Sequence, residues 1–123
     1  MEEKSPYKWV MEGCQLAQNG DYEQAIECFD HAIDMEPGYA EAWSVKAAAL
    51  VELGRREEAI PCFDMALDIN TDDASTWTTK GVNYLNLGRF QDAIESYDHA
   101  LSLDPDSELA RRGKEIAEEQ LRS

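Results

Sequence analysis

An internal repeat with a period of 34 residues constrains the fold of this chain more than any other feature. Six positions carry the same residue in three successive copies: Trp9, Trp43 and Trp77; Gly20, Gly54 and Gly88; Ala25, Ala59 and Ala93; Ile26, Ile60 and Ile94; Asp30, Asp64 and Asp98; Ala32, Ala66 and Ala100. A fixed period of this length is the signature of a repeat architecture, in which stacked supersecondary units bury one another's apolar faces. We therefore expect three copies of one structural unit.

Each copy is expected to form two helices, because its apolar residues recur at intervals of three and four. In the second copy these residues are Trp43, Ala47, Leu50 and Val51, followed by Ala59, Phe63, Ala66 and Leu67. The invariant glycine is expected to end the first helix in a left-handed conformation, which costs glycine little. Asp21 is placed to cap the following helix. Pro61 falls inside a second helix, where its missing amide predicts a kink or a shortened first turn.

The period, together with the tryptophan, glycine, alanine, aromatic and proline positions, resembles the tetratricopeptide repeat (TPR). The resemblance covers residues 6–107. The chain departs from the family pattern in one column, which holds Glu12, Lys46 and Lys80 in place of leucine, and at Ala47, which replaces a glycine. The resemblance implies an all-α fold: a right-handed α-solenoid of three helix-turn-helix units plus a solvating helix.

The repeat boundaries divide the chain, taken as one domain, into five segments. We expect an N-terminal leader at 1–5, TPR 1 at 6–39, TPR 2 at 40–73, TPR 3 at 74–107 and a C-terminal capping helix at 108–123. In the last segment Ser107 is a possible N-cap, and the apolar face is sparse, with Leu109, Ile116 and Leu121. Such a helix covers the apolar side that the last repeat would otherwise expose.

Composition restricts the partners and the setting of the protein. The chain has 26 acidic and 11 basic residues and a net charge of −15, which repels nucleic acid and anionic lipid and favours a neutral to basic protein or peptide. No apolar run approaches the roughly 20 residues that cross a membrane. The stretch MEEKSPYKWV lacks the apolar segment of a secretory signal, and three cysteines cannot all pair within one chain. We therefore expect a cytoplasmic location.

A calcium site is considered and not predicted. The stretch DINTDD, residues 68–73, begins like a calcium-binding loop. That loop needs glycine at its sixth position and glutamate at its twelfth, which are Asp73 and Thr79 here. Because the sister copies carry no comparable ligand set, the stretch is interpreted as the connection between repeats.

No enzyme activity, metal or cofactor is predicted from the remaining reactive side chains. His31 and His99 occupy the same column two copies apart, too far to share a metal, and are expected at the surface. Cys14, Cys28 and Cys62 are expected to pack as thiols, because neither histidine lies on a first helix beside Cys14. The tryptophans are assigned to the core between helices and not to an aromatic cage for a cation.

TPR proteins bind extended or helical peptides in a groove lined by their first helices, and the resemblance implies the same function here. The corresponding groove residues are Tyr7, Val10, Cys14, Ala17, Gln18, Glu41, Ser44, Val45, Ala48, Glu52, Ser75, Thr78, Thr79, Val82 and Asn86. The spacing of Val10, Cys14 and Ala17 independently places these three residues on one helical face. The ligand is expected to carry small apolar side chains, with Glu41 and Glu52 placed to meet a basic residue.

The best-known form of this groove clamps the C-terminal carboxylates of heat-shock chaperones with lysine, asparagine and arginine. Its five positions fall on Val10, Cys14, Val45, Ser75 and Thr79 in this chain. None of these side chains can donate a charge-assisted hydrogen bond, so a chaperone-tail clamp is not expected. We expect a monomer or a weak homodimer. The alternative to a peptide-binding module or scaffold is structural: self-association through the repeat ends, or a fragment of a longer TPR array.

Overall fold

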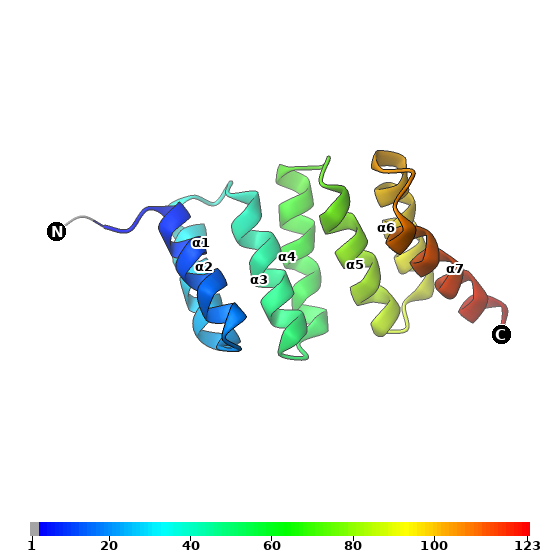
Figure 1. Ribbon diagram of the computed structural model, residues 1–123, viewed down its shortest axis with the longest axis horizontal. Coiled ribbons are helices and arrows are strands. Elements are labelled where there is room, and N and C mark those ends of the chain that lie inside the picture. The colour runs from blue at the N-terminus through cyan, green and yellow to red at the C-terminus, as the bar shows by residue number, and fades with distance from the viewer. Residues whose placement is uncertain (1–2) are drawn as a thin grey trace. The chain divides into compact units, whose positions relative to one another are not determined.

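The computed structural model describes residues 3–123, and in that range it contains seven α-helices and no strand (Figure 1). The helices are α1 (Pro6–Gln18), α2 (Tyr22–Met35), α3 (Ala40–Glu52), α4 (Arg56–Ile69), α5 (Ala74–Asn86), α6 (Phe90–Leu103) and α7 (Glu108–Arg122). The expected all-α helical repeat is confirmed. None of these helices combines the length and apolar character needed to cross a bilayer.

The helices pack into two compact units. The first ends at Asn70 and holds α1 to α4, and the second, Thr71–Ser123, holds α5 to α7. In the first unit α1 packs on α2, α2 on α3 and α3 on α4, and in the second α6 packs on both α5 and α7. The starts of α1, α3, α5 and α7 are each separated by 34 residues, so α7 continues the register of the first helices.

Glycine ends the first helix of each pair, as the sequence predicts. The φ angles of Gly20, Gly54 and Gly88 are 86°, 80° and 76°, in the left-handed region that glycine adopts without a steric penalty. No other residue among those described has a positive φ. The turns from α1 to α2, α3 to α4 and α5 to α6 therefore share one conformation.

Side-chain caps begin three of the helices. The hydroxyl of Ser5 accepts from the amide of Lys8, and that of Ser107 accepts from Ala110, both at 3.2 Å. The carboxylate of Asp73 accepts from the amide of Thr76 at 3.2 Å, which gives this part of the DINTDD stretch a structural role. The prediction for Asp21 is wrong, because Asp21 precedes α2 but its side chain makes no capping hydrogen bond.

Pro61 does not shorten its helix. It lies at the sixth residue of α4, whose 14 residues match the length of α2 and α6. The predicted shortened first turn is therefore absent from α4.

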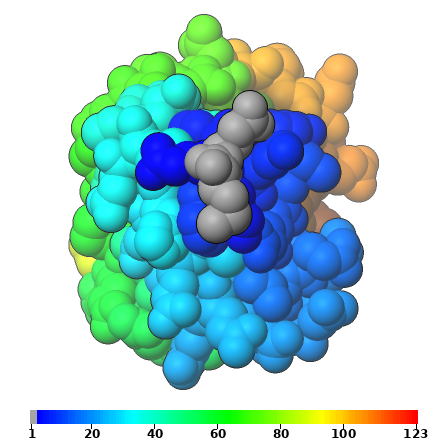
Figure 2. All heavy atoms as spheres, turned by 90° about the vertical axis from the view of Figure 1, so that its left-hand side faces the viewer, coloured from blue at the N-terminus to red at the C-terminus, as the bar shows by residue number. Residues whose placement is uncertain are grey.

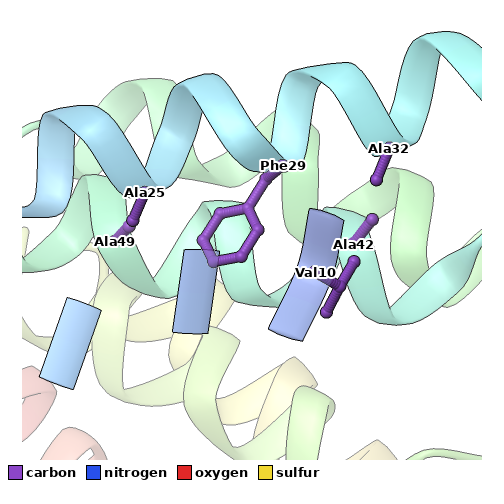
Figure 3. Packing of buried hydrophobic residues seen from close by; sticks show 6 residues of the cluster. All are labelled: Val10, Ala25, Phe29, Ala32, Ala42 and Ala49. Atoms are coloured by element: carbon purple, nitrogen blue, oxygen red, sulfur yellow. The ribbon is translucent and has the colours of Figure 1, made fainter. Parts of the chain in front are cut away.

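The core of the first unit is built from one aromatic ring and many alanines. Phe29 of α2 is 1% exposed, and Figure 3 shows it within a cluster of small residues. The other members are Val10, Ala25, Ala32, Ala42 and Ala49. In Figure 3 the side chains of Ala25 on α2 and Ala49 on α3 lie next to each other, so two small residues meet where these helices pack.

The core of the second unit repeats this arrangement around Tyr97 of α6, which is 1% exposed. A methyl group added at Gly81 of α5 would lie 2.7 Å from Cε1 of Tyr97, and one added at Gly113 of α7 would lie 2.6 Å from its hydroxyl oxygen. The backbone of two helices, at Gly81 and Gly113, therefore packs directly against the Tyr97 side chain, and neither position has room for a larger residue.

Two ion pairs join helices at the column that departs from the family pattern. Nζ of Lys46 on α3 lies 2.7 Å from Oδ1 of Asp30 on α2, and Nζ of Lys114 on α7 lies 2.8 Å from Oδ1 of Asp98 on α6. Lys114 follows Lys80 by 34 residues. Lysine at this column therefore exchanges an apolar contact for a partly exposed ion pair with the invariant aspartate.

Gly81→Ala is expected to destabilise the protein even though alanine favours helix over glycine by about 1 kcal/mol. The added methyl group would displace the Tyr97 ring, and overpacking of this kind costs about 1–3 kcal/mol. Urea unfolding followed by circular dichroism measures the change. Gly38→Ala is the matched control, since a methyl group there meets no atom within 4 Å. Equal unfolding midpoints for the two variants would contradict the packing described for Tyr97.

Tyr97 is expected to make the fold sensitive to alkaline pH. Burial raises the pKa of Tyr97 from 10.0 to about 12, so the folded state favours the neutral phenol. The contribution of this phenol to the free energy of unfolding is complete below pH 10 and is lost as the pH rises from 10 to about 12. In that range the free energy of unfolding falls by up to about 1.4 kcal/mol per pH unit. Tyr97→Phe should flatten this loss in urea unfolding, because phenylalanine has no hydroxyl to ionise. The ring should fit, since phenylalanine fills the same column at Phe29 and Phe63. Identical alkaline slopes for the two proteins would rule out this role.

Candidate peptide-binding surface

A cavity of about 220 Å³ opens between α1 and α3 in the first unit. Its walls come from α1, the first residue of α2, the core ring and α3: Cys14, Ala17, Gln18, Tyr22, Phe29, Val45, Ala48, Ala49 and Glu52. Six of these residues were predicted from the sequence as groove residues, namely Cys14, Ala17, Gln18, Val45, Ala48 and Glu52. The structure therefore brings together predicted residues from two different helices.

Four other predicted residues of the first unit lie outside this cavity. Val10 is 2% exposed and belongs to the core cluster, so it offers a ligand almost no surface. Tyr7 is 59% exposed, Glu41 is exposed and Ser44 is half-buried. Tyr7 and Glu41 are each the second residue of their helix, toward the end opposite the cavity.

The α1–α3 cavity is mainly apolar, with polar groups at its rim. Tyr22, Phe29, Val45 and the alanines supply its walls, while Gln18 and Glu52 are exposed to solvent. Burial, and then the charge of Glu41, raise the pKa of the Cys14 thiol. Cys14 therefore stays neutral near physiological pH and serves as a small apolar wall residue.

A second cavity, of about 270 Å³, lies in the second unit. It is lined by Ala74, Ser75, Thr78, Thr79, Asp104, Ser107 and Leu109. The hydroxyls of Thr78 and Thr79 donate to the carbonyls of Ala74 and Ser75, each at 2.9 Å. These two threonines are therefore committed to their own helix as donors. Val82 and Asn86, also predicted, lie on α5 but do not line this cavity.

Stacked tryptophan and histidine rings are a feature that the sequence interpretation missed. Trp9 stacks on His31 with ring centroids 4.3 Å apart, and Trp77 stacks on His99 at 4.1 Å. Both histidines are exposed, as predicted. The signal was present in the sequence, because a histidine follows 22 residues after each of these two tryptophans but not after Trp43.

The tryptophans also contact lysines and loops of their own unit. Nζ of Lys4 lies 4.3 Å from the Trp9 ring centroid, and Nζ of Lys80 lies 5.3 Å from that of Trp77. The indole of Trp43 donates to the carbonyl of Pro37 at 2.9 Å, and that of Trp77 donates to Thr71 at the same distance. These contacts tie each indole to the segment before its helix.

The outer faces of α2 and α6 carry shallow acidic hollows. One is lined by Glu27, Asp30, His31 and Asp34, and its counterpart by Glu95, Asp98, His99 and Ser102. Asp30 and Asp98 are the partners of the interhelix lysines. Across residues 3–123, no three histidine, cysteine or acidic side chains are grouped so that they could hold a metal ion.

Sequence reasoning missed four residues at or near the α1–α3 cavity. Tyr22, Phe29 and Ala49 line the cavity, and Tyr39 packs beside the same core cluster just before α3. The family pattern assigns the groove to first helices only. Tyr22 and Phe29 come from α2 and Tyr39 from a connection, so only the packing of the helices places them here.

Comparison with known proteins identifies relatives of this arrangement. A family model described as "Tetratricopeptide repeat" matches residues 16–80, and another with the same description matches residues 74–107. No curated protein matches the sequence.

Several solved structures share the fold. The first TPR of Spaghetti (RPAP3), bound to the HSP90 peptide SRMEEVD, is 20% identical with a TM-score of 0.93, and the match covers 100% of this chain and 98% of that one. The Arabidopsis OM64 TPR domain is 20% identical with a TM-score of 0.88, covering 94% and 95%. The MamA protein is 23% identical with a TM-score of 0.90, covering 95% and 64%. At these identities the similarity establishes the fold.

Proposed function

Because this chain belongs to the tetratricopeptide repeat family, with a family model matching residues 16–80, we propose that it is a non-enzymatic protein-interaction module. Its ligand is a peptide segment that binds between α1 and α3, the first helices of the first two repeats. A structural neighbour with the same fold is bound to a peptide, SRMEEVD. The proposal places the ligand of this chain on the corresponding helices.

The α1–α3 cavity is the observation that carries this proposal. A dry engineered cavity of about 150 Å³ holds a benzene molecule, so a cavity of about 220 Å³ has room for one aliphatic or aromatic side chain. Its largely apolar walls would hold that side chain by burial, worth about 1.5–3 kcal/mol for a large apolar residue. Backbone hydrogen bonds and flanking contacts would supply the remaining affinity.

The wall chemistry also supports a ligand unlike the tail of a heat-shock chaperone. At the positions of the carboxylate clamp, Val10 is buried, while Cys14 and Val45 line an apolar cavity. Thr79 donates its hydroxyl proton to its own helix. Because Glu41 and Glu52 are exposed on α3, an acidic tail would be repelled. We therefore propose a neutral to basic partner. The free thiols of Cys14, Cys28 and Cys62 favour a cytoplasmic setting.

Self-association is the alternative function, and the surface of α7 favours it. Leu109, Ile116 and Leu121 are 64%, 42% and 51% exposed, so α7 presents apolar side chains to solvent. Sedimentation at increasing protein concentration separates the two functions. A constant monomer mass supports the binding module, whereas a mass that rises with concentration, and that Ile116→Glu returns to monomer, supports self-association.

Ala48→Arg is expected to abolish peptide binding while leaving the fold intact. Ala48 is exposed at the cavity, so the arginine stem would fill the cavity without disturbing the core. The probes are dodecapeptides selected from a random displayed library on the wild-type protein, then synthesised with a fluorophore. Anisotropy measures their Kd, and circular dichroism checks helical content. Salt should change Kd little, because exposed ion pairs are worth only about 0–1 kcal/mol.

Glu95→Gln on the outer face of α6 is the control variant and should bind the same peptides as tightly as the wild type. The labelled peptide SRMEEVD serves as a negative control. Unimpaired binding by Ala48→Arg, or tight binding of SRMEEVD, would refute the proposed site or its proposed chemistry.

A further inference from the structure

Two tyrosines and a carboxylate gather at the N-terminal ends of α1 and α3. Tyr7 and Glu41 are the second residues of these helices and occupy the same repeat position, 34 residues apart. Equivalent positions on neighbouring helices lie about 8–10 Å apart. Tyr39 immediately precedes α3. The start of α3 and the surface of α1 meet in Figure 2, where cyan atoms lie beside blue ones.

The electrostatics of these residues agree with this placement. Burial raises the pKa of Tyr39, and Glu41 and Tyr7 are the next largest causes. Glu41 also raises the pKa of Cys14, which lines the α1–α3 cavity. The charge of Glu41 therefore acts on Tyr39 and also on one residue of the cavity wall.

Contacts within the described part of the chain leave the carboxylate without an ion pair and the two rings without a stacked partner. Within residues 3–123, Glu41 has no ion-pair partner, and neither Tyr7 nor Tyr39 has a stacking or cation–π partner. The invariant aspartates Asp30 and Asp98, by contrast, are each paired with a lysine. Glu41 is therefore an exposed negative charge with two rings near it: that of Tyr7, which is exposed, and that of Tyr39, which is half-buried against the core cluster.

We propose that Tyr7, Tyr39 and Glu41 form a subsite for the cationic side chain of an arginine or lysine in the bound peptide. This inference rests on the proposed function, since it names the ligand chemistry on the same two helices, toward their N-terminal ends. A carboxylate pairs with the cation, and a tyrosine face within about 6 Å attracts it further. Arginine is preferred to lysine, because its planar guanidinium both stacks on a ring and pairs bidentately with a carboxylate.

The distance between cavity and subsite fixes the spacing that the ligand needs. Glu41 precedes Ala48 by seven residues, which corresponds to about 10 Å along a helix at 1.5 Å per residue. An extended peptide advances about 3.3 Å per residue. The arginine should therefore lie about three positions from the apolar side chain that fills the cavity. Glu52, four residues beyond Ala48, favours another cation on the opposite side.

The first test is the sequence pattern of dodecapeptides selected on the wild-type protein. We expect an apolar residue with arginine or lysine enriched about three positions away, and acidic residues depleted at that position. Selection on Glu41→Gln should retain the apolar residue and lose the basic preference. The control is Glu27→Gln, which removes an equal charge from the exposed outer face of α2 and should keep the full pattern.

The second test is a coupling measurement on one selected peptide and its citrulline analogue, in which a neutral isostere replaces arginine. Glu41→Gln should weaken binding of the arginine peptide about three- to tenfold, the range for an exposed ion pair with a cation–π contribution. Glu41→Gln should leave binding of the citrulline peptide unchanged, because citrulline has already removed the ion pair between the arginine and Glu41. Tyr7→Ala should weaken the arginine peptide, and Tyr7→Phe, which keeps the ring, should restore it.

The outcomes separate this inference from the proposed function. The cation subsite would be overturned, and the peptide-binding module retained, if the selected peptides depend on Ala48 but show no basic preference. The same holds if they lose as much affinity with Glu27→Gln as with Glu41→Gln. Failure of the wild type to select any peptide, or indifference to Ala48→Arg, would overturn both.

Discussion

In each compact unit the helices are held against an aromatic side chain of a second helix, and the small residues around that ring set how closely they approach. Phe29 is covered by alanines of its own helix and of α3, and Tyr97 by the backbone at Gly81 and Gly113. Dispersion contacts at this separation are weak singly but numerous. The alanine columns and these glycines are therefore constrained by volume, and helix propensity has little influence on them.

The same packing creates the candidate site. Because Phe29 enters between α1 and α3, its ring forms one wall of the cavity, and the small side chains Ala17 and Ala48 leave the space above it open. Larger residues at those two positions would close the cavity without harming the core. The fold thus fixes the back of the site, while residues facing solvent determine what enters.

Charge is distributed differently on the two kinds of helix. On the second helices, Asp30 and Asp98 are neutralised by lysines from α3 and α7 and so contribute to helix pairing. On α3, Glu52 is exposed at the cavity, and Glu41 is exposed at the start of the helix. Some acidic side chains are therefore paired within the fold, whereas others are exposed to solvent. The net charge of the chain does not distinguish the two groups.

The sequence by itself determined the period, the two helices per copy and the left-handed glycines, because these depend on local spacing and on backbone sterics within one turn. It also identified six residues of the α1–α3 cavity. The tertiary structure alone decided that Val10 is core, that Asp21 makes no side-chain cap, and that Trp9 stacks on His31. It also placed Tyr39 against the core cluster. These features depend on the rotation and separation of neighbouring helices, which are set by how side chains far apart in the sequence fill shared volume.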